Sequence, residues 1–499
     1  MKRGWLLGIL LSLAGCGRLE FGKMEGPEGE VGEIKIVYPY PSTYHALLDT
    51  TQLKLQPEHV GVEKFSVSPA LPAGLSLAET TGKISGVPSA VADRVKYTIT
   101  GTGAAGEATA EIYLTALTGW KVDARSDIPD DDGGQDAVCF STGAGGCTLR
   151  AAVECANKHT TRKLILLPAG LIAVNATLTP LLNDMVIAGE GIDSTVLSPN
   201  PLGQTQSLLA FESSHQIRLE NLSVRNFTPA TDSTVMVKDG VFEAFEVEFR
   251  GNQSVTSGAV AAIDRGARAH FENVTFLENE ALGNPGWGGV IIGTGAETKI
   301  AVHSSTAMNN KAIWGSFAYV QGGATLELVN SSLVGNQAIT AGTLASPDGH
   351  YRVIHSTIAF NTIMGSQSAG LYFNEKDATF TVGNSIIAHN KNGSGIVKNC
   401  DRREDMGKLT SLGGNVLSDD AGDCAAFFTG AGDVTEVDPL LETILPVSGG
   451  GHTKTMPLQS ESKAIDRGVG ALCPPRDQRG AVRKLSSAGT CDSGAYERE

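Results

Sequence analysis

Aromatic residues and clusters of positive charge are scarce in this chain. The first scarcity bears on the fold class, and the second bears on the kind of partner that the protein can bind. Phe, Trp and Tyr make up 6% of the 499 residues. Lys and Arg number 39 against 54 Asp and Glu, which leaves a net charge of −15. Nucleic acid is bound through basic patches, so it is not expected as a partner. Few aromatics and 60 glycines favour an all-β protein rich in turns.

Long apolar runs are also missing, apart from one short run at the start of the chain. Lys2 and Arg3 precede a mostly apolar stretch from Trp5 to Leu13. This stretch is too short to span a bilayer as a helix, so it predicts a secretory signal rather than a transmembrane segment.

The signal ends in a motif that resembles the lipobox of bacterial lipoproteins, Leu13-Ala-Gly-Cys16. The resemblance implies that residues 1–16 hold a lipoprotein signal, which is cleaved before Cys16, and that Cys16 carries a diacylglyceryl thioether. Gly17, in place of an Asp, implies sorting to the outer membrane, with the protein held in the cell envelope by its N-terminal lipid. The alternative is an ordinary signal peptide with a chance cysteine. Residues 17–33 are rich in Gly and Glu and predict a flexible tether.

The centre of the chain is an internal repeat in which a polar residue is followed six places later by Asn. The copies run over Glu246–Asn252, Asn273–Asn279, His303–Asn309, Asn330–Asn336, His355–Asn361 and Asn384–Asn390, after a shorter copy at Asn221–Asn226. The closing asparagines are 25 to 30 residues apart. They form the expected structural Asn column: Asn226, Asn252, Asn279, Asn309, Asn336, Asn361 and Asn390.

Each copy holds short runs of β-branched and aromatic residues bounded by Asn or Gly, which predict strands. A unit this small cannot bury its own apolar face, so copies must stack as coils of a parallel β-helix. The closing Asn suits a bend with positive φ, and stacked Asn side chains can hydrogen-bond as a ladder. The irregular spacing predicts a right-handed coil, of the pectin-lyase-like kind. His303 and His355 fall among the opening polar residues and are expected to be structural.

Seven cysteines remain after Cys16, and export favours disulfides. Spacing does not determine connectivity. The near pairs are the expected ones: Cys139–Cys147, Cys400–Cys424 and Cys473–Cys491. Cys155 is then left over, buried on a short helix.

Residues 34–117 alternate apolar and polar residues as half-buried strands do. The run Leu71-Pro-Ala-Gly-Leu-Ser-Leu77, followed by Thr81-Gly-Lys-Ile-Ser-Gly86 and Pro88, resembles the bacterial immunoglobulin-like, cadherin-like domain family. The resemblance implies a β-sandwich that acts as a spacer. Residues 118–137, with the acidic loop Asp127–Asp136, are expected to be a solvated linker; calcium binding there is the alternative.

The solenoid is expected over residues 138–425. Cys147-Thr-Leu-Arg-Ala-Ala resembles the Cys-Ser-Leu-Arg-Glu-Ala motif of secreted β-helix proteins, and the helix from Thr148 to Asn157 is expected to cap the N-terminal end. Strands are expected at Lys163–Leu167 and Met185–Ala188.

The last part of the chain, 426–499, resembles the domain called choice-of-anchor Q. The motifs include Asp438-Pro-Leu-Leu441, Asp477-Gln-Arg-Gly480 and Cys491-Asp-Ser-Gly-Ala-Tyr-Glu497. No reaction is implied by the resemblance. The charged residues of this tail are expected to form an ion-paired cap over the last coil: Asp466, Arg476, Asp477, Arg479, Asp492 and Glu497.

Two function classes follow. Glycoside hydrolysis needs two carboxyl groups about 5 to 9.5 Å apart, and the acids of the coil region do not line up in one repeat column: Asp264, Glu272, Glu278, Glu297, Glu327, Asp348, Glu375 and Asp377. We therefore assign no catalytic residue, metal or cofactor. We expect a lipid-anchored, surface-exposed structural or binding protein, adhesin-like or a scaffold for polysaccharide or a cell-surface partner.

The alternative is a polysaccharide lyase or glycoside hydrolase with an active site across coils. Exposed aromatics on one coil face would favour sugar binding, and the candidates are Trp287, Trp314, Tyr319, Tyr351 and Tyr372. Oligomeric state is open.

Overall fold

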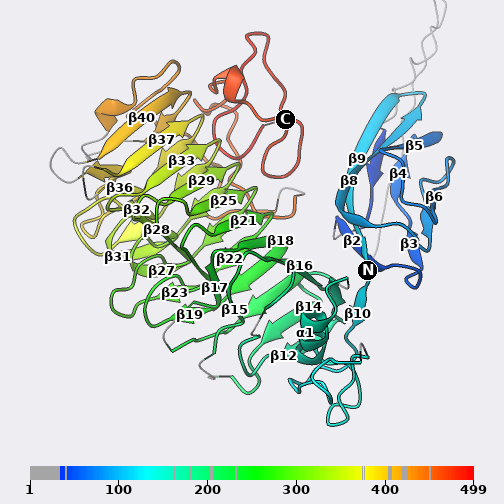
Figure 1. The fold of residues 1–499 in the computed structure, drawn as a ribbon. Coiled ribbons are helices and arrows are strands. Elements are labelled where there is room, and N and C mark those ends of the chain that lie inside the picture. Colours follow the sequence, from blue (N-terminus) through cyan, green and yellow to red (C-terminus); the bar gives the residue numbers. More distant parts are fainter. Residues whose placement is uncertain are drawn as a thin grey trace, which may run out of the picture.

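The computed structural model describes residues 34–498, except 40–41, 137, 162, 179–180, 203–205, 231–232, 374, 376, 403–406, 419–424 and 449–450. The expected signal, lipid site and tether lie outside the described residues. The all-β prediction is confirmed: an Ig-like domain precedes a β-solenoid of about 9 turns (Figure 1).

The Ig-like domain is a sandwich of two sheets around a core that includes Phe65, Ile84 and Ile99. One sheet has the order β2-β9-β8-β5 and the other β3-β7-β6, while β1 pairs with β4. The strands are β1 (Lys35–Val37), β2 (Thr43–Leu47), β3 (Leu53–Leu55), β4 (Glu58–Val60), β5 (Lys64–Ser68), β6 (Leu75–Leu77), β7 (Ile84–Gly86), β8 (Ala92–Gly103) and β9 (Gly106–Leu117).

The largest solenoid sheet has two faces, because β16 (Gln216–Arg225) and β18 (Val241–Arg250) bend through the corner between them. The first face continues through β21 (Arg268–Glu272), β25 (Lys299–His303), β29 (Thr325–Val329), β33 (His350–Ile354), β37 (Thr379–Gly383) and β40 (Lys408–Gly413). The second continues through β22 (Thr275–Leu277), β26 (Thr306–Met308), β30 (Ser332–Val334), β34 (Thr357–Ala359), β38 (Ile386–Ala388) and β41 (Val416–Leu417).

Two further parallel sheets complete the coils. The five-stranded sheet holds β19 (Gln253–Ser254), β23 (Glu280–Ala281), β27 (Lys311–Trp314), β31 (Gln337–Ala341) and β35 (Thr362–Ile363). The eight-stranded sheet holds β15 (Leu209–Glu212), β17 (Val235–Lys238), β20 (Ala261–Asp264), β24 (Ile291–Thr294), β28 (Ala318–Gln321), β32 (Leu344–Ser346), β36 (Leu371–Phe373) and β39 (Cys400–Arg402).

The N-terminal end of the solenoid is closed by α1 (Leu149–Lys158), whose N-cap Thr148 accepts a hydrogen bond from the Ala151 amide. The first strands are β10 (Gly119–Lys121), β11 (Leu164–Leu166), β12 (Gly170–Ala173), β13 (Met185–Ala188) and β14 (Thr195–Ser198). The expected linker is therefore shorter than 118–137. β10 pairs with β11, and Trp120 and Val122 are buried in the solenoid core, so the coil already starts there.

A ladder of buried asparagines runs along the solenoid after the second face. From Asn279 to Asn390, each Asn side-chain oxygen accepts from the backbone N–H and side-chain NH₂ of the Asn one coil earlier, and Asn399 accepts in the same way from Asn390, nine residues before it. These distances are 2.8 to 3.3 Å. The asparagine ladder consists of Asn252, Asn279, Asn310, Asn336, Asn361, Asn390 and Asn399.

Two residues of the expected column are one place too early. Asn226 and Asn309 directly precede the ladder position and take positive φ, 62° and 57°. The left-handed bend thus belongs to the residue before the ladder, which is Gly251, Glu278, Gly335, Phe360 or His389 in other coils. We expected one Asn to take the positive-φ bend and also to form the ladder hydrogen bonds. This was wrong, because the bend and the hydrogen bonds belong to two consecutive residues.

The opening residues of the repeat form a corner column between the two faces, all with φ between 47° and 57°. The corner column consists of Asn221, Glu246, Asn273, Ser304, Asn330, His355 and Asn384. His303 is not a member: it ends β25 and pairs with Glu272, so Ser304 takes the bend. Ser305, Ser331, Ser356 and Ser385 follow the corner and form a second buried ladder.

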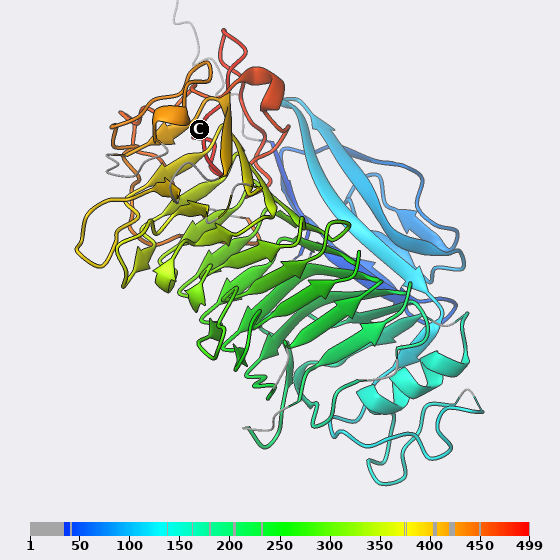
Figure 2. The same ribbon diagram turned by 60° about the vertical axis from the view of Figure 1, so that its left-hand side comes forward.

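The corner column is covered on the outside by the Ig-like domain and by the tail, which meet where Arg476 pairs with Glu111 at 3.3 Å (Figure 2). We call this side the covered flank. The Ig-like domain is therefore docked along the solenoid and is not an extended spacer.

The tail includes η1 (Ala425–Phe427) and η2 (Gly470–Leu472). Its first part lies on the last coil, where Phe428 packs into the solenoid core and Val434 bridges Val416, but the tail does not end there. It runs back along the second face, where Met456, Leu458 and Ala464 pack on Val334 and Ala388. The physical reason is that β30, β34 and β38 are buried at every residue, so their outer side needs an apolar cover.

Disulfides join Cys139 to Cys147 and Cys473 to Cys491, while Cys155 is a buried free thiol. Cys400 is disulfide-bonded, and its expected partner Cys424 lies outside the described residues. No described helix has both the length and the apolarity needed to cross a bilayer.

Candidate functional site

Buried charges hold the Ig-like domain on the covered flank. The Glu220 carboxylate is fully buried and contacts His45 Nε2 at 2.6 Å and Arg218 Nη1 at 3.2 Å. Arg218 also pairs with Asp93 and Glu243. Burial opposes ionisation of Glu220, but the charges of His45 and Arg218 hold its pKa below the ordinary value. These groups serve domain docking.

Glu246 and Arg94 complete this interface. The buried Glu246 carboxylate accepts from the Ser42 amide at 3.1 Å and from the Ser42 hydroxyl. The Arg94 guanidinium lies 3.5 Å from the Phe245 ring centroid. Sequence reasoning missed this interface. Its one signal was Glu246 itself, an acid in a column otherwise held by Asn, Ser or His.

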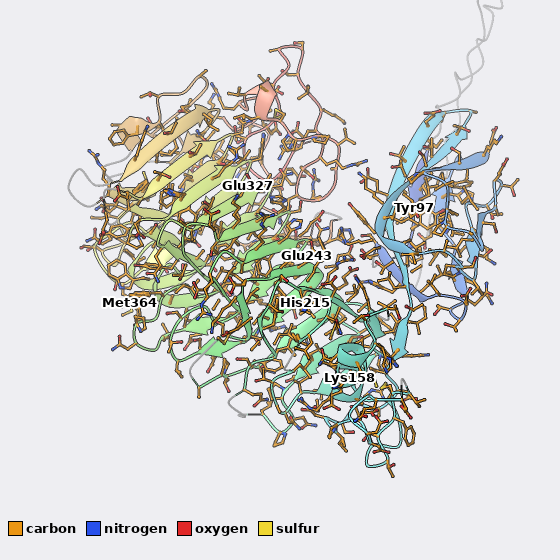
Figure 3. All side chains as sticks on the ribbon, viewed as in Figure 1. Tyr97, Lys158, His215, Glu243, Glu327 and Met364 are labelled. Carbon is orange, nitrogen blue, oxygen red and sulfur yellow. A yellow bond between two sulfur atoms is a disulfide. The ribbon has the colours of Figure 1, made fainter. Side chains whose placement is uncertain are left out.

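Glu243 and Glu327 of the first face do not make a hydrolytic pair. Glu243 and Glu327 share one outward column, but they stand three coils apart, about 14 Å. That exceeds the 5 to 9.5 Å that glycoside hydrolases use. Glu327 is also paired with His303 and Arg352. Figure 3 shows Glu243 and Glu327 on the side that faces the Ig-like domain.

His270 lies between these groups, one coil after Glu243. Its ring packs edge-on against Phe245 at 5.4 Å and His303 at 5.2 Å. Burial, reinforced by His303, lowers the pKa of His270 to about 4. It is therefore neutral at physiological pH and packs as an aromatic ring.

In two groups of side chains, the atoms that could bind a metal lie within 4.8 Å of one another. The groups are His355 with Cys473 and Cys491, and Asp130 with Cys139 and Cys155. Each group contains disulfide-bonded sulfur, which is not a thiolate and cannot bind as one. In the described part of the chain, neither group offers a complete set of ligands.

The acidic loop before the helix is structural. Asp130, 7% exposed, accepts from the Gly134 and Phe140 amides, and Asp127 pairs with Arg150 at 2.7 Å. Asp131 and Asp132 likewise accept backbone N–H groups. These carboxylates fasten the loop to the helical cap, so the calcium alternative gains no support.

Four of the five candidate aromatics gather in one cluster at the corner between the five- and eight-stranded sheets. Trp287 stacks on Tyr319 with centroids 5.2 Å apart and ring planes 10° apart, and Trp314 contacts Tyr372 at 5.9 Å. Trp287 and Trp314 are bridged, so they stand one coil apart. Tyr351 is different: its ring is inside the solenoid and its hydroxyl donates to the Ala318 and Ala345 carbonyls.

The tyrosines support the tryptophans and do not face solvent. Tyr319 is 7% exposed and Tyr372 is 3% exposed, whereas both tryptophans are half-buried. Burial, with the nearby carboxylates of Asp348 and Glu375, raises the pKa of Tyr319 to about 12. The cluster thus presents two half-buried indole rings on a base of buried tyrosines.

A second surface feature, which sequence reasoning missed, lies on the five-stranded sheet. Its outer side carries an aliphatic column, one residue per coil: Val255, Leu282, Ile313, Ile339 and Met364. Each stands three places after a ladder asparagine, so a fixed offset in the sequence would have revealed it. A polar column runs beside it: Gln253, Glu280, Lys311, Gln337, Thr362 and Lys391.

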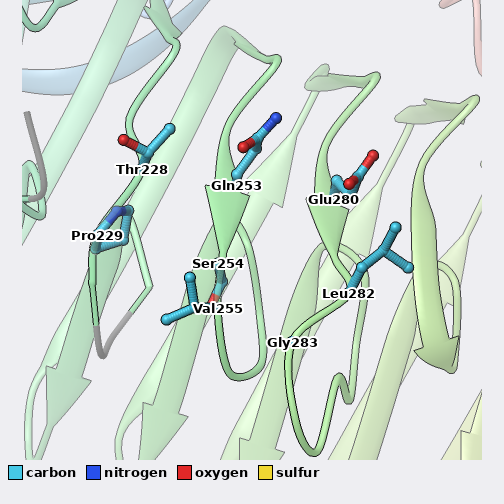
Figure 4. Close-up of a pocket in the computed structure, with 8 residues that line it drawn as sticks. All are labelled: Thr228, Pro229, Gln253, Ser254, Val255, Glu280, Leu282 and Gly283. Carbon is cyan, nitrogen blue, oxygen red and sulfur yellow. The ribbon is translucent and has the colours of Figure 1, made fainter. Parts of the chain in front are cut away.

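One end of this surface is hollowed (Figure 4). The hollow has a volume of about 200 Å³ and lies across three neighbouring coils. It is smaller than the pockets of about 300 Å³ or more that hold small-molecule ligands. Its lining is Thr228, Pro229, Gln253, Ser254, Val255, Glu280, Leu282 and Gly283.

Comparison with known proteins identifies only the first domain. A family model described as "Putative Ig domain" matches residues 39–117. No curated protein matches the chain. The catalytic domain of a GH87 alpha-1,3-glucanase in complex with nigerose aligns over 79% of this chain and 87% of that chain, at 9% identity and a TM-score of 0.22.

An Asp-to-Ala variant of that glucanase domain in complex with tetrasaccharides aligns over the same shares at 9% identity, with a TM-score of 0.24. Scores this low transfer neither activity nor substrate to this chain.

Proposed function

We propose that this protein is a lipid-anchored carbohydrate-binding scaffold of a bacterial cell surface. The observation that carries the proposal is the pair of half-buried tryptophans, Trp287 and Trp314, held one coil apart by buried tyrosines. Indole rings pack on the apolar C–H face of a sugar ring, and their fixed position costs little conformational entropy on binding.

Nearby carboxylates complete the chemistry of recognition. Asp348 and Glu375 lie close enough to Tyr319 to raise the pKa of its hydroxyl. Carboxylate oxygens accept hydrogen bonds from sugar hydroxyls. A few polar groups beside an aromatic surface are the usual composition of a small-ligand site.

The lipid anchor and surface location rest on the sequence, namely the lipobox-like motif that ends in Cys16. The resemblances to the Cys-Ser-Leu-Arg-Glu-Ala and choice-of-anchor Q types, and a right-handed coil, belong to the same proposal. Mass spectrometry of the N-terminal peptide tests it: an acylated Cys16 is expected, and an unmodified cysteine would contradict the anchor.

The binding test uses the full chain and a polysaccharide panel, with and without Ca²⁺, and records both binding and release of reducing or unsaturated ends. We expect binding without product. Trp314→Ala should weaken binding about tenfold, the loss of roughly 1.4 kcal/mol. Phe140→Ala is the matched control, because Phe140 is 45% exposed and outside the cluster.

Product release would contradict the binding-only proposal and favour the lyase or hydrolase alternative. Equal binding by Trp314→Ala and the unmodified chain would show that the cluster is only a packing feature.

A further inference from the structure

The aliphatic column is an exposed apolar surface on the side of the solenoid opposite the covered flank. Val255 is 53% exposed, Leu282 39%, Ile339 40% and Met364 68%. Ile396, 51% exposed, lies beside the end of the column. Figure 3 places Met364 at the edge farthest from the Ig-like domain. A contiguous row of this kind marks an interaction surface in a soluble protein.

From this surface we propose that the protein forms a two-fold symmetric dimer, with the five-stranded sheets of two copies packed face to face. The two-fold axis runs along β31, through Gln337 and Ile339. This interaction is independent of carbohydrate binding.

Charge complementarity selects the second copy as the occupant. Glu280 stands two coils before β31 in the polar column, and Lys391 stands two coils after it. Glu280 also contacts Lys311 of its own chain, at 3.7 Å and near the surface. A two-fold axis along β31 reverses the order of coils and leaves the strand direction unchanged. Glu280 of each copy then faces Lys391 of the other, and the interface is isologous.

The two neighbouring placements of the axis, half a coil to either side, are worse. A shift of half a coil towards β35 sets Lys311 opposite Lys391, and like charges repel. A shift of half a coil towards β27 sets Glu280 opposite Thr362, and the opposite-charge pair is lost. Of these three placements, only the axis along β31 brings Glu280 and Lys391 together at both ends of a contact that is five coils long.

The aliphatic column agrees with the same axis. Ile339 meets its own mate, Ile313 meets Met364, and Leu282 meets the turn that holds Gly393 and Ile396. Both copies have the same coil spacing of about 4.8 Å, so the side chains of the two columns stay in register along the whole contact. The contact spans about 20 Å, which places the dimer among small, reversible interfaces.

The first test is the mass of the full chain by sedimentation equilibrium over a concentration series. We expect a reversible dimer, and Ile339→Asp should be monomeric at every concentration with an unchanged unfolding midpoint. A monomeric unmodified chain would overturn the proposal. So would growth beyond dimers, or a dimer that survives Ile339→Asp.

The second test checks the axis by cross-linking. Ile339→Cys should form a disulfide-linked dimer on oxidation, because residue 339 meets its mate. Val255→Cys is the matched control from the same column, and two copies of it would lie about 29 Å apart. Equal cross-linking of both variants would overturn the placement of the axis.

The third test reverses charges. Glu280→Lys and Lys391→Glu should each weaken the dimer about tenfold, and the double variant should restore the original dissociation constant. Failure of the double variant to recover would overturn the proposed pairing.

Discussion

The two flanks of the solenoid reverse the usual distribution of polar and apolar residues. On the covered flank, charged groups such as Glu220, Glu246 and Arg218 are buried beneath the Ig-like domain. On the opposite side, which carries the five-stranded sheet and which we call the open flank, the aliphatic column is exposed. Buried charges are tolerated where each has a partner, and exposed aliphatics in a row are typical of a surface that binds something. The contrast shows which side is already occupied within the chain.

The largest expected effect is inside the solenoid, between the flanks. The Asn336 side chain accepts two hydrogen bonds from Asn310 and donates to Asn361 and to the Ala307 carbonyl. Asn336→Ala leaves several of these groups buried without partners, so we expect a loss of about 4 kcal/mol in the free energy of unfolding. Chemical denaturation measures it.

The control is an asparagine outside the ladder. Asn309 is exposed and takes φ 57°, so Asn309→Gly should change the free energy of unfolding by less than about 0.5 kcal/mol. Equal losses at Asn309 and Asn336 would contradict the ladder as the source of stability.

The next effect is on the covered flank. Glu220→Ala leaves His45 without its carboxylate and removes one partner of Arg218, and we expect a cost of about 3 kcal/mol in domain docking. Faster limited proteolysis near residue 118 reports the loosened domain. Because the folded pKa of Glu220 is below 4.5, this contribution is present above pH 4.5 and is lost as the pH falls further. Unchanged proteolysis would contradict the role of Glu220.

A smaller effect concerns His270. Its folded pKa of about 4 lies below the ordinary 6.5, so the unfolded chain takes up the proton first. The contribution of neutral His270 to the free energy of unfolding is fully present above pH 6.5. It is lost between pH 6.5 and 4, by up to about 3 kcal/mol. His270→Phe keeps a ring against Phe245 and should flatten this part of the stability–pH curve. An equally steep curve for the variant would assign the pH dependence to another group.

The smallest effect is on the open flank. Met364→Ser removes an exposed side chain, so we expect a change below about 0.5 kcal/mol in the free energy of unfolding. Val353→Ser is the matched control, because Val353 is fully buried in the solenoid core. It should cost about 3 kcal/mol or more. A large loss in Met364→Ser would show that the aliphatic column supports the fold itself.

Sequence reasoning was strongest where a property repeats. The coils, the helix N-capped by Thr148 and the Ig-like sandwich follow from periodicity and turn chemistry, which are local. At Asn226, Asn309 and His303, the predicted position was one residue away from the residue that has the expected role. A bend at positive φ and a buried hydrogen bond occupy neighbouring positions, and the sequence alone does not say which asparagine does which.

Contacts between distant parts were beyond the sequence. Glu220 and His45 are 175 residues apart, and only folding brings their side chains together. The tail was expected over the last coil, and it begins there at Phe428 and Val434. It also covers the second face, because the outer sides of β30, β34 and β38 need burial. Among the candidate aromatics, the sequence could not separate the enclosed Tyr351 from the half-buried Trp287 and Trp314.

By itself, the sequence determined that this protein is a stack of β coils behind an Ig-like domain, since a short repeat unit can bury its apolar residues only against copies of itself. Only the tertiary structure decided which sides of the stack are covered and which are open. That choice depends on long-range packing and on charge pairs such as Arg476 with Glu111, which no local pattern records.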